Sequence, residues 1–487
     1  MTNSIFSFCI TENSIDIPEL TVKRSFGKYT VLTDDSTPFS YASDSSCECG
    51  IFGFAVNVLD GNSDNIAPKI LAECKDIQSV VDYEKQLGGK YVIFFKSNDE
   101  YYIQGDATCS IPIFYNTDGN LICSSNYQYI VNEKNYSQDA EFGLIRRSGD
   151  LSQAMPYDIT PFREIKQLIP NHYLDMGEKK AVRFINSANV QSRVTVEKAT
   201  ETVRPMIENL LSYYIKLFKI YCPITSGKDS RVVLAFLMNQ NTDFRCYTIK
   251  HPHHREDTQD IVVPASLCRE NGLCYEQIKD VEVSDALKNE MDRMLGNGIY
   301  SLRTLQIAQT IKEHYGDGAI INGDIIGQVG KCSLHRDIPS IFATPAYFRC
   351  KLHNYSRGAK KQLKLWLEEI KASGEKVNTF DLFSVENRMG RWAAQENLIY
   401  NSIGQTYLNI FNSRSIIYTW TAVSRGERKL SALHIGLINE TTPILLNIPF
   451  GKDENLVYKI SKSNGIAYLI SSYLKYYIEK IKFEKGK

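Results

Sequence analysis

Residues Thr225-Ser226-Gly227-Lys228-Asp229-Ser230 have the side chains that a phosphate-binding loop requires. The two serines and the glycine are small enough to let backbone N–H groups approach an anion. Lys228 adds a mobile cation, and the carboxylate of Asp229 can hold a metal ion or shape the loop. The segment is not a Walker loop, because the chain contains no Gly-x-x-x-x-Gly-Lys-Ser/Thr motif.

The residues around this segment predict a turn from a strand to a helix. An apolar stretch, residues 218–224, precedes it, and a helical run at 232–238 begins near Ser230. The positive end of that helix points at the place where the loop would hold an anion. A second strand, predicted at 244–249, completes a βαβ unit, in which ligands bind at the carboxyl ends of the strands. An ordinary Ser/Gly-rich turn is the alternative interpretation.

The overall composition is that of a globular protein with large cores. The chain has 487 residues, of which 43% are apolar and 23% charged, and this length suggests two or three domains. Its 56 basic and 56 acidic side chains balance, so we expect it to bind neither nucleic acid nor a membrane. The start of the chain does not resemble a signal peptide, and the 12 cysteines lack zinc-site spacing. We therefore expect free thiols and a cytoplasmic location.

Two kinds of pattern divide the chain near residue 190. Up to about residue 186, short segments rich in β-branched and aromatic residues alternate with turns, which predicts a β-rich domain over 1–190. An amphipathic helix is predicted at 196–219, and strands then alternate with helices, the pattern of a parallel α/β sheet over 191–487. After about residue 360 the chain reads as mostly helical. The predicted strands are 29–33, 51–58, 90–95, 101–104, 111–115 and 121–124, followed by 221–225, 244–249 and 319–322.

Motifs in both halves together resemble the asparagine synthetase family. They are Leu87-Gly88-Gly89-Lys90-Tyr91, Gly105-Asp106, Ile111-Pro112-Ile113-Phe114-Tyr115, residues 160–170, and the segment 225–230, which is similar to the Ser-Gly-Gly-x-Asp-Ser pyrophosphate loop. That family joins a class II glutaminase-like domain to an ATP pyrophosphatase domain. The resemblance implies an α+β glutaminase-like (Ntn-type) sandwich before the parallel-sheet α/β domain. It also implies ATP and Mg²⁺ as the ligands.

A second segment, residues 319–328, stands where the family has an apolar strand ending in Ser-Gly-Glu-Gly-x-Asp-Glu. Asp324 matches the first acid, so the resemblance implies that Asp229 and Asp324 hold Mg²⁺ and that Asn322 and Gly323 contact the nucleotide. Gly327-Gln328 replaces the second acidic pair, which is a departure from the family pattern. A simple turn at 322–324 is the alternative.

The second predicted strand ends near Ile249, where the family has its adenine-side loop, so Ile249 is a candidate contact of the nucleotide. The histidine-rich segment at 251–254 lacks the i, i+4 spacing of a helical zinc site and is interpreted as a polar loop. Asp257 and Asp260 follow it. They either reach the nucleotide or cap the next helix.

The family places a catalytic lysine in its C-terminal region, near the adenylated intermediate, where a fixed cation can neutralise developing charge. Lys429 is the candidate in this chain, and Arg428 is the alternative. Arg388, Arg391 and Trp392 share one face of another predicted helix. Charged runs of this kind are more often solvated faces.

The N-terminal half departs from a working glutaminase. The second residue is Thr2 where such an enzyme exposes a cysteine nucleophile, and residues 50–53 are the nearest relic of the glutamine-binding segments. We therefore expect no glutamine hydrolysis, so that the nitrogen comes from free ammonia or from an amine on a substrate.

These observations predict an ATP-dependent, AMP-forming amide ligase. Its partners would be a small-molecule or peptide carboxylate, such as aspartate, a uronic acid or a specialised metabolite, and an amine; a homo-oligomer is possible. The rival from another class is a catalytically inactive protein that kept the fold as a binding or scaffold module. Gly327-Gln328 favours the rival, and the intact segment 225–230 argues against it.

Overall fold

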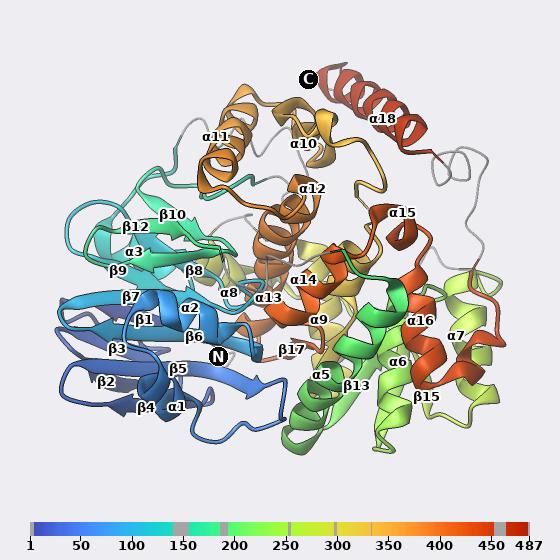
Figure 1. The fold of residues 1–487 in the computed structure, drawn as a ribbon, viewed down its shortest axis with the longest axis horizontal. Coiled ribbons are helices and arrows are strands. Elements are labelled where there is room, and N and C mark those ends of the chain that lie inside the picture. The colour runs from blue at the N-terminus through green and yellow to red at the C-terminus, as the bar shows by residue number, and fades with distance from the viewer. Residues whose placement is uncertain are drawn as a thin grey trace.

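Three β-sheets organise the computed structural model, which describes residues 4–139, 155–185, 193–251, 255–296, 300–332, 334–451 and 464–485. The N-terminal strands stack at one side of the molecule, and the third sheet with its helices occupies the other (Figure 1). The predicted fold class is confirmed: antiparallel sheets come first, a parallel sheet follows, and the C-terminal part is helical. The boundary predicted near residue 190 lies outside the described residues.

Two six-stranded antiparallel sheets form the N-terminal half. In β6, Val92 and Phe94 belong to the core between the two sheets, whereas Ile93 and Phe95 pack with the helices on the outer face. This alternation follows from the two-residue period of a strand. The first sheet contains, in order, β10 (Ile165–Leu168), β8 (Ile113–Asn116), β9 (Ile122–Ser124), β1 (Phe8–Thr11), β3 (Tyr29–Thr33) and β2 (Val22–Phe26); the second contains β12 (Lys180–Arg183), β11 (His172–Asp175), β7 (Glu100–Gly105), β6 (Leu87–Ser97), β5 (Cys47–Asn57) and β4 (Phe39–Ser43).

The third sheet is five-stranded and parallel. Its order is β15 (Tyr275–Lys279), β14 (Phe244–Lys250), β13 (Ile220–Pro223), β16 (Ala319–Asn322) and β17 (Thr406–Asn409). Chain order therefore reverses between β13 and β16. The crevice outside the carboxyl ends of these two neighbouring strands is the place where such sheets bind ligands. The two segments singled out in the sequence, 225–230 and 322–324, both begin at that crevice.

Helices cover both faces of the parallel sheet. Cys222 and Ile321 face a core made with α5 (Val196–Leu217), α6 (Asp229–Asn239), α14 (Arg414–Ala422) and α16 (Ala432–Thr441). Tyr221 and Ile320 face the opposite core, made with α8 (Asp285–Leu295), α9 (Leu302–Tyr315) and α13 (Ala394–Ser402). The remaining helices in the described parts of the chain are α1 (Ile66–Glu73), α2 (Ile77–Glu84), α3 (Tyr127–Lys134), α7 (Gln259–Glu270), η2 (Ile326–Gly330), η3 (Ser340–Phe342), α10 (Pro345–Lys351), α11 (Arg357–Ser373), α12 (Thr379–Leu382), η4 (Phe383–Ala393), α15 (Arg425–Arg428), η5 (Pro443–Leu446) and α18 (Gly465–Lys485).

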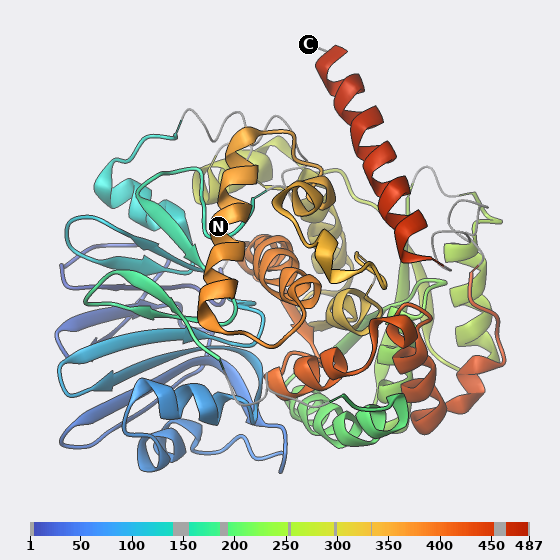
Figure 2. The same ribbon diagram turned by 45° about the horizontal axis from the view of Figure 1, so that its top comes forward.

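The C-terminal helices form a separate layer at the edge of the molecule. Helices α10, α11 and α12 share an aromatic-rich core with part of α18, and α18 itself stands at the margin (Figure 2). Searching the described residues for a helix that is long and apolar enough to cross a bilayer finds none.

Buried polar contacts join the two halves. Lys90 of β6 donates from Nζ to the side-chain oxygens of Asn397 at 2.7 Å and Asn401 at 2.9 Å, both on α13. Arg414 of α14 donates to Glu84 of α2 at 2.5 Å, and both side chains are almost fully buried. Removing one partner of such a buried pair leaves an uncompensated charge, so these contacts fix the N-terminal sheets against the parallel sheet.

Candidate functional site

The loop between β13 and α6 folds back on the start of the helix. The backbone N–H of Thr225 donates to Ser230 Oγ at 3.2 Å, and that of Gly227 donates to Thr225 Oγ1 at 3.2 Å. Helix α6 starts at Asp229 after Lys228, whose side chain makes no capping hydrogen bond. The first-turn N–H groups of a helix have no partner within the helix. The N–H groups of Thr225 and Gly227 are therefore used within the loop, and the donors that an anion could meet here are those of the first turn of α6.

Ser226 is held by a carboxylate from α7. Its N–H and its hydroxyl both donate to Asp260 Oδ1, at 2.8 and 2.6 Å. Asp260 does not occupy the N-cap of α7, which is Thr258, and lies in the first turn of that helix. Chain from the C-terminal part also covers the loop: Gly451 N–H donates to Ser226 O at 3.1 Å, and the ring of Phe450 lies 4.7 Å from the Lys228 ammonium.

Asp229 lies in a positively charged environment. Its Oδ1 is 2.8 Å from His434 Nε2 and 3.8 Å from Lys331 Nζ. Burial opposes ionisation, but the hydrogen bond from His434 and the charges of Lys331 and Lys228 outweigh it and lower the pKa of Asp229. Burial also lowers the pKa of His434. Asp229 is therefore an anion at neutral pH.

Two glycines allow the loop after β16 to approach Asp229. A Cβ at Gly323 would lie 2.8 Å from Asp229 O, and a Cβ at Gly327 would lie 2.8 Å from Asp229 Oδ2. Both distances are shorter than real Cβ contacts. A side chain at position 327 would therefore displace the Asp229 carboxylate from its present position.

Asp324 is coupled to Asp229. Tyr407 of β17 donates its hydroxyl to Asp324 Oδ2 at 2.8 Å. Burial raises the pKa of Asp324 to about 6, the charge of Asp229 adds to the increase, and Tyr407 and Arg388 oppose it. Asn322 supports this loop: it donates to Leu408 O at 2.8 Å and accepts the Asp324 N–H at 3.0 Å. The carboxylates of Asp229 and Asp324 therefore face one crevice, and repulsion between their charges is unfavourable.

This pair suits a metal that completes its coordination with substrate oxygens. Mg²⁺ is usually bound through one or two carboxylates together with phosphates and water. No group of three or more His, Cys, Asp or Glu side chains in the described parts of the chain is placed to hold a metal ion. The donors thus fit Mg²⁺ brought with a phosphorylated ligand better than a metal held by the protein alone.

Sequence reasoning missed three side chains of this site, His434, Lys331 and Glu396. Burial raises the pKa of Glu396 on α13 to about 8, and the charge of Asp324 contributes to the shift. His434 and Glu396 come from elements distant in sequence from both carboxylates, whereas Lys331 directly follows η2, close to Asp324. Ile249, the candidate contact of the nucleotide, lies at the carboxyl end of β14, beside Thr248, whose hydroxyl donates to Ile224 O at 2.6 Å.

Arg428 and Lys429 are adjacent in the sequence but have different partners. Arg428 is fully buried and donates to both carboxylate oxygens of Asp381, at 2.9 and 2.7 Å, and to the carbonyl of Val329 at 2.8 Å. Both ends of its guanidinium are thus engaged by Asp381 and the backbone inside the core. Lys429 pairs with Asp337 at 2.6 Å. The cation beside Asp229 is Lys331.

The other basic side chains singled out in the sequence also differ in what they contact. Arg388 stacks over Trp392 at 4.5 Å and faces the acids, whereas Arg391 donates to Met155 O at 3.3 Å. His251 contacts Asp280 Oδ2 at 3.0 Å. Residues 252–254 lie outside the described residues.

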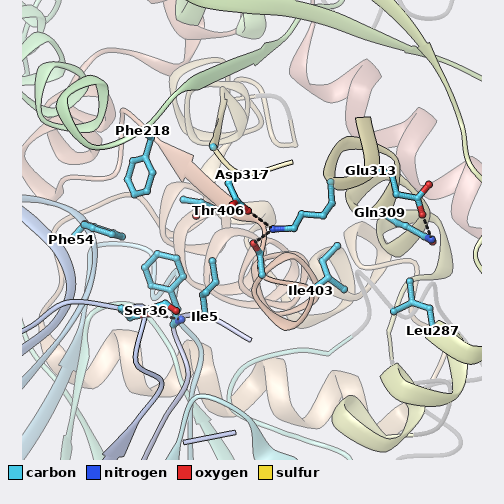
Figure 3. A pocket seen from close by; sticks show the side chains of 15 residues that line it. Ile5, Ser36, Phe54, Phe218, Leu287, Gln309, Glu313, Asp317, Ile403 and Thr406 are labelled. Carbon is cyan, nitrogen blue, oxygen red and sulfur yellow. Dashed lines mark hydrogen bonds and ion pairs between the residues drawn. The ribbon is translucent and has the colours of Figure 1, made fainter. Parts of the chain in front are cut away.

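A large cavity lies at the opposite end of the parallel sheet. It measures about 810 Å³ and is lined by apolar side chains such as Phe54 and Phe218 and by polar ones such as Gln309 and Glu313 (Figure 3). Lys312 crosses it and donates to Asp317 Oδ1 and Gly404 O, both at 2.9 Å. A much smaller cavity, about 20 Å³, touches Asp324. The large cavity therefore does not contain the predicted phosphate loop.

No family model matches the chain, and no curated protein matches it. Similar solved structures include the glutamine phosphoribosylpyrophosphate amidotransferase of B. subtilis, with 11% identity over 69% of this chain and 72% of that one, at a TM-score of 0.23. The NMN synthetase of Francisella tularensis has 13% identity over 43% of this chain and 94% of its own, with a TM-score of 0.20. An allosteric regulatory enzyme of purine biosynthesis has 9% identity over 74% and 86%, with a TM-score of 0.24. At these values the likeness carries no functional argument.

Proposed function

We propose that this chain is an ATP-dependent amide ligase that forms an acyl-adenylate and transfers the acyl group to an amine or to ammonia. The observation that carries the proposal is the meeting of the 225–230 loop with Asp324 at the point where strand order reverses. That place combines backbone donors, cations and paired carboxylates. These are the groups needed to bind a nucleoside triphosphate with its metal.

In the proposed reaction a carboxylate oxygen of the substrate attacks the α-phosphorus of ATP, and the bond from that phosphorus to the bridging oxygen of pyrophosphate breaks. The nitrogen of the amine then attacks the acyl carbon, the carbon–oxygen bond to AMP breaks, and the nitrogen loses a proton. The loop would bind the pyrophosphate part. Asp229 and Asp324 would hold Mg²⁺, which when bound neutralises phosphate charge.

The chain's own cations have separate roles in this proposal. Lys331, 3.8 Å from Asp229, would balance charge beside the pyrophosphate. Lys429, in its contact with Asp337, remains the proposed cation for the acyl-transfer step. No nucleophilic side chain is needed, because activation depends on phosphate binding and charge neutralisation.

We also propose that glutamine is not the nitrogen source. Residues 50–53, the nearest relic of the glutamine-binding segments, lie inside β5 and pair in register with β6, with Gly50 opposite Phe94 and Gly53 opposite Tyr91. Thr2 lies outside the described residues. The candidate acids are aspartate, a uronic acid, and a peptide or specialised metabolite.

The test is exchange of labelled pyrophosphate into ATP with a panel of carboxylic acids, together with identification of the nucleotide product. AMP and pyrophosphate are expected. Production of ADP and orthophosphate would show that cleavage at the α-phosphorus is the wrong proposal. The rival, a catalytically inactive binding protein, predicts ATP binding without exchange for any acid. Its supporting observation is the engagement of both Ser226 donors by Asp260.

A further inference from the structure

The outer side of helix α18 carries a continuous apolar stripe. Ile466, Ile470, Leu474 and Ile478 recur every four residues and are 50%, 56%, 60% and 54% exposed. Side chains four apart lie on the same helix face. Tyr477 and Ile481 extend this stripe at 52% and 50% exposure. Scattered exposed apolar residues are ordinary, but a contiguous stripe marks an interaction surface.

The opposite side of α18 fixes the direction in which the stripe points. Tyr476 is buried and donates its hydroxyl to Asn354 O at 3.0 Å. Lys351 of α10 donates to Tyr468 and to Ser472, both at 2.9 Å. The helix is thus docked through its inner side. In Figures 1 and 2 it stands at the margin of the molecule, with no other drawn helix or strand on its outer side.

Lysines border the stripe on both sides. Lys475 and Lys482 each follow a stripe residue by one position, which places them about 100° further round the helix. Lys480 precedes Ile481 by one position and so borders the other edge. The four lysines of α18, Lys475, Lys480, Lys482 and Lys485, outnumber its two glutamates; Glu479 pairs with Lys475 at 3.8 Å and Glu484 with Lys480 at 3.6 Å, so the helix keeps a positive excess.

We propose that this surface binds the face of an anionic lipid bilayer, with α18 lying in the plane of the interface. An amphipathic helix with lysines along its apolar face is the arrangement that inserts side chains at the headgroup boundary. The long lysine stems let their ammonium groups reach lipid phosphates while the stripe is immersed. The charge balance of the whole chain predicted no membrane binding. That balance is a sum over all residues, however, and α18 itself carries more positive than negative side chains.

A second copy of the chain fits the surface less well. Pairing two α18 helices through their stripes would bring the bordering lysines of both copies together, and like charges at close range are unfavourable. One helix face is also small beside the ~1,600 Å² that a standard stable interface buries. A lipid surface supplies the opposite charge without that area requirement.

The direct experiment is sedimentation of the full-length protein with vesicles of phosphatidylcholine alone, or with an equal part of phosphatidylglycerol. Binding is expected only to the anionic vesicles and should weaken as salt is raised, since screening reduces attraction to surface charge. Leu474→Asp and Ile478→Asp should each weaken it about tenfold or more. Leu302→Asp is the matched control, because Leu302 is 55% exposed but lies on α9.

A second measurement follows insertion itself. Ile478→Trp keeps an apolar side chain in the stripe, and its fluorescence should shift to the blue with anionic vesicles and not with phosphatidylcholine vesicles. Failure of the wild-type protein to sediment with anionic vesicles would overturn the proposal, as would unchanged binding by folded Leu474→Asp. A concentration-dependent dimer that Leu474→Asp abolishes, without vesicle binding, would assign the surface to a second copy. None of these outcomes depends on ATP or on the loop.

Discussion

One oxygen of Asp260 accepts both the backbone N–H and the hydroxyl of Ser226, at 2.8 and 2.6 Å. Asp260 is in the first turn of α7, whereas Ser226 is in the loop before α6. In a phosphate-binding loop those two donors would face the anion. The Asp260 carboxylate thus takes the position of an anionic ligand, and a bound phosphate must compete with it.

Asp260→Asn should therefore increase affinity for pyrophosphate. The amide oxygen can still accept both hydrogen bonds, but the negative charge beside the ligand is gone. We expect about tenfold tighter binding, equivalent to about 1.4 kcal/mol, measured by isothermal titration calorimetry. Asp257→Asn is the control, because Asp257 is 71% exposed and pairs with Arg255 at 3.0 Å. Weaker binding in Asp260→Asn would mean that the carboxylate builds the loop and does not compete with the ligand.

Asp229→Asn should keep the fold but remove most turnover. Loss of one preorganised electrostatic contact commonly costs about 3 kcal/mol, more than a hundredfold in rate. Ser226→Ala should cost less, because the backbone N–H groups remain. Affinity for ATP with Mg²⁺, exchange rate and thermal midpoint are measured for both variants. An unaltered exchange rate in well-folded Asp229→Asn protein would remove the loop from the mechanism.

The local parts of the site were predictable, and the parts assembled by packing were not. The 225–230 loop and Asp324 lie directly after apolar strands, so short-range pattern locates them. Strand β17 is only four residues long and partly polar, and it forms because β16 is beside it. This strand supplies Tyr407, which contacts Asp324. Helix α16 supplies His434, which contacts Asp229 although the two residues are more than 200 positions apart in the sequence.

Adjacent residues also defeat pattern reading when they point in different directions. Arg428 and Lys429 look equivalent as a charged pair in the sequence. In the structure Arg428 contacts Asp381 inside the core, and Lys429 contacts Asp337 nearer the surface. Only the partners distinguish them, and both partners are tens of residues away.

The raised pKa of Asp324, about 6, predicts opposite pH effects on activity and stability. Activity should rise as pH passes through about 6, because Mg²⁺ needs the ionised carboxylate. Stability should fall as pH rises from about 4 to about 6. The folded protein holds this proton more tightly than the unfolded chain, in which the pKa of Asp is about 3.9, so raising the pH between the two pKa values favours the unfolded chain.

Asp324→Asn removes this conflict at the expense of activity. At about pH 8 the variant should gain about 1–3 kcal/mol in the free energy of unfolding, the order of a two-unit pKa shift. Near pH 4 the gain should vanish, because the wild-type carboxyl is then protonated. Urea unfolding at the two pH values checks this. A loss of stability at about pH 8 would instead make the ionised carboxylate a structural element.

The purified protein should release no ammonia from glutamine. Pairing with β6 occupies the backbone of residues 50–53, and the neighbouring Cys49 is buried, which raises the pKa of its thiol and keeps it protonated. The measurement is ammonia release compared with a heat-killed control. Release that disappears in Thr2→Ala would contradict the expectation and would identify Thr2 as a nucleophile.

Arg428→Met and Lys429→Met should separate stability from catalysis. Arg428→Met leaves Asp381 buried without its cation, and breaking such a pair costs about 3–5 kcal/mol, so the thermal midpoint should drop steeply. Lys429 and Asp337 have side chains 10% and 33% exposed. Loss of that partly exposed pair should cost about 1 kcal/mol or less.

Amide formation should nevertheless fall about a hundredfold in Lys429→Met if its ammonium neutralises charge in the acyl step, while pyrophosphate exchange stays close to the wild-type rate. Lys331→Met is the matched comparison, and it should slow exchange because Lys331 lies 3.8 Å from Asp229. If folded Lys429→Met forms the amide at the full rate and Lys331→Met exchanges slowly, the catalytic role belongs to Lys331 and not to Lys429.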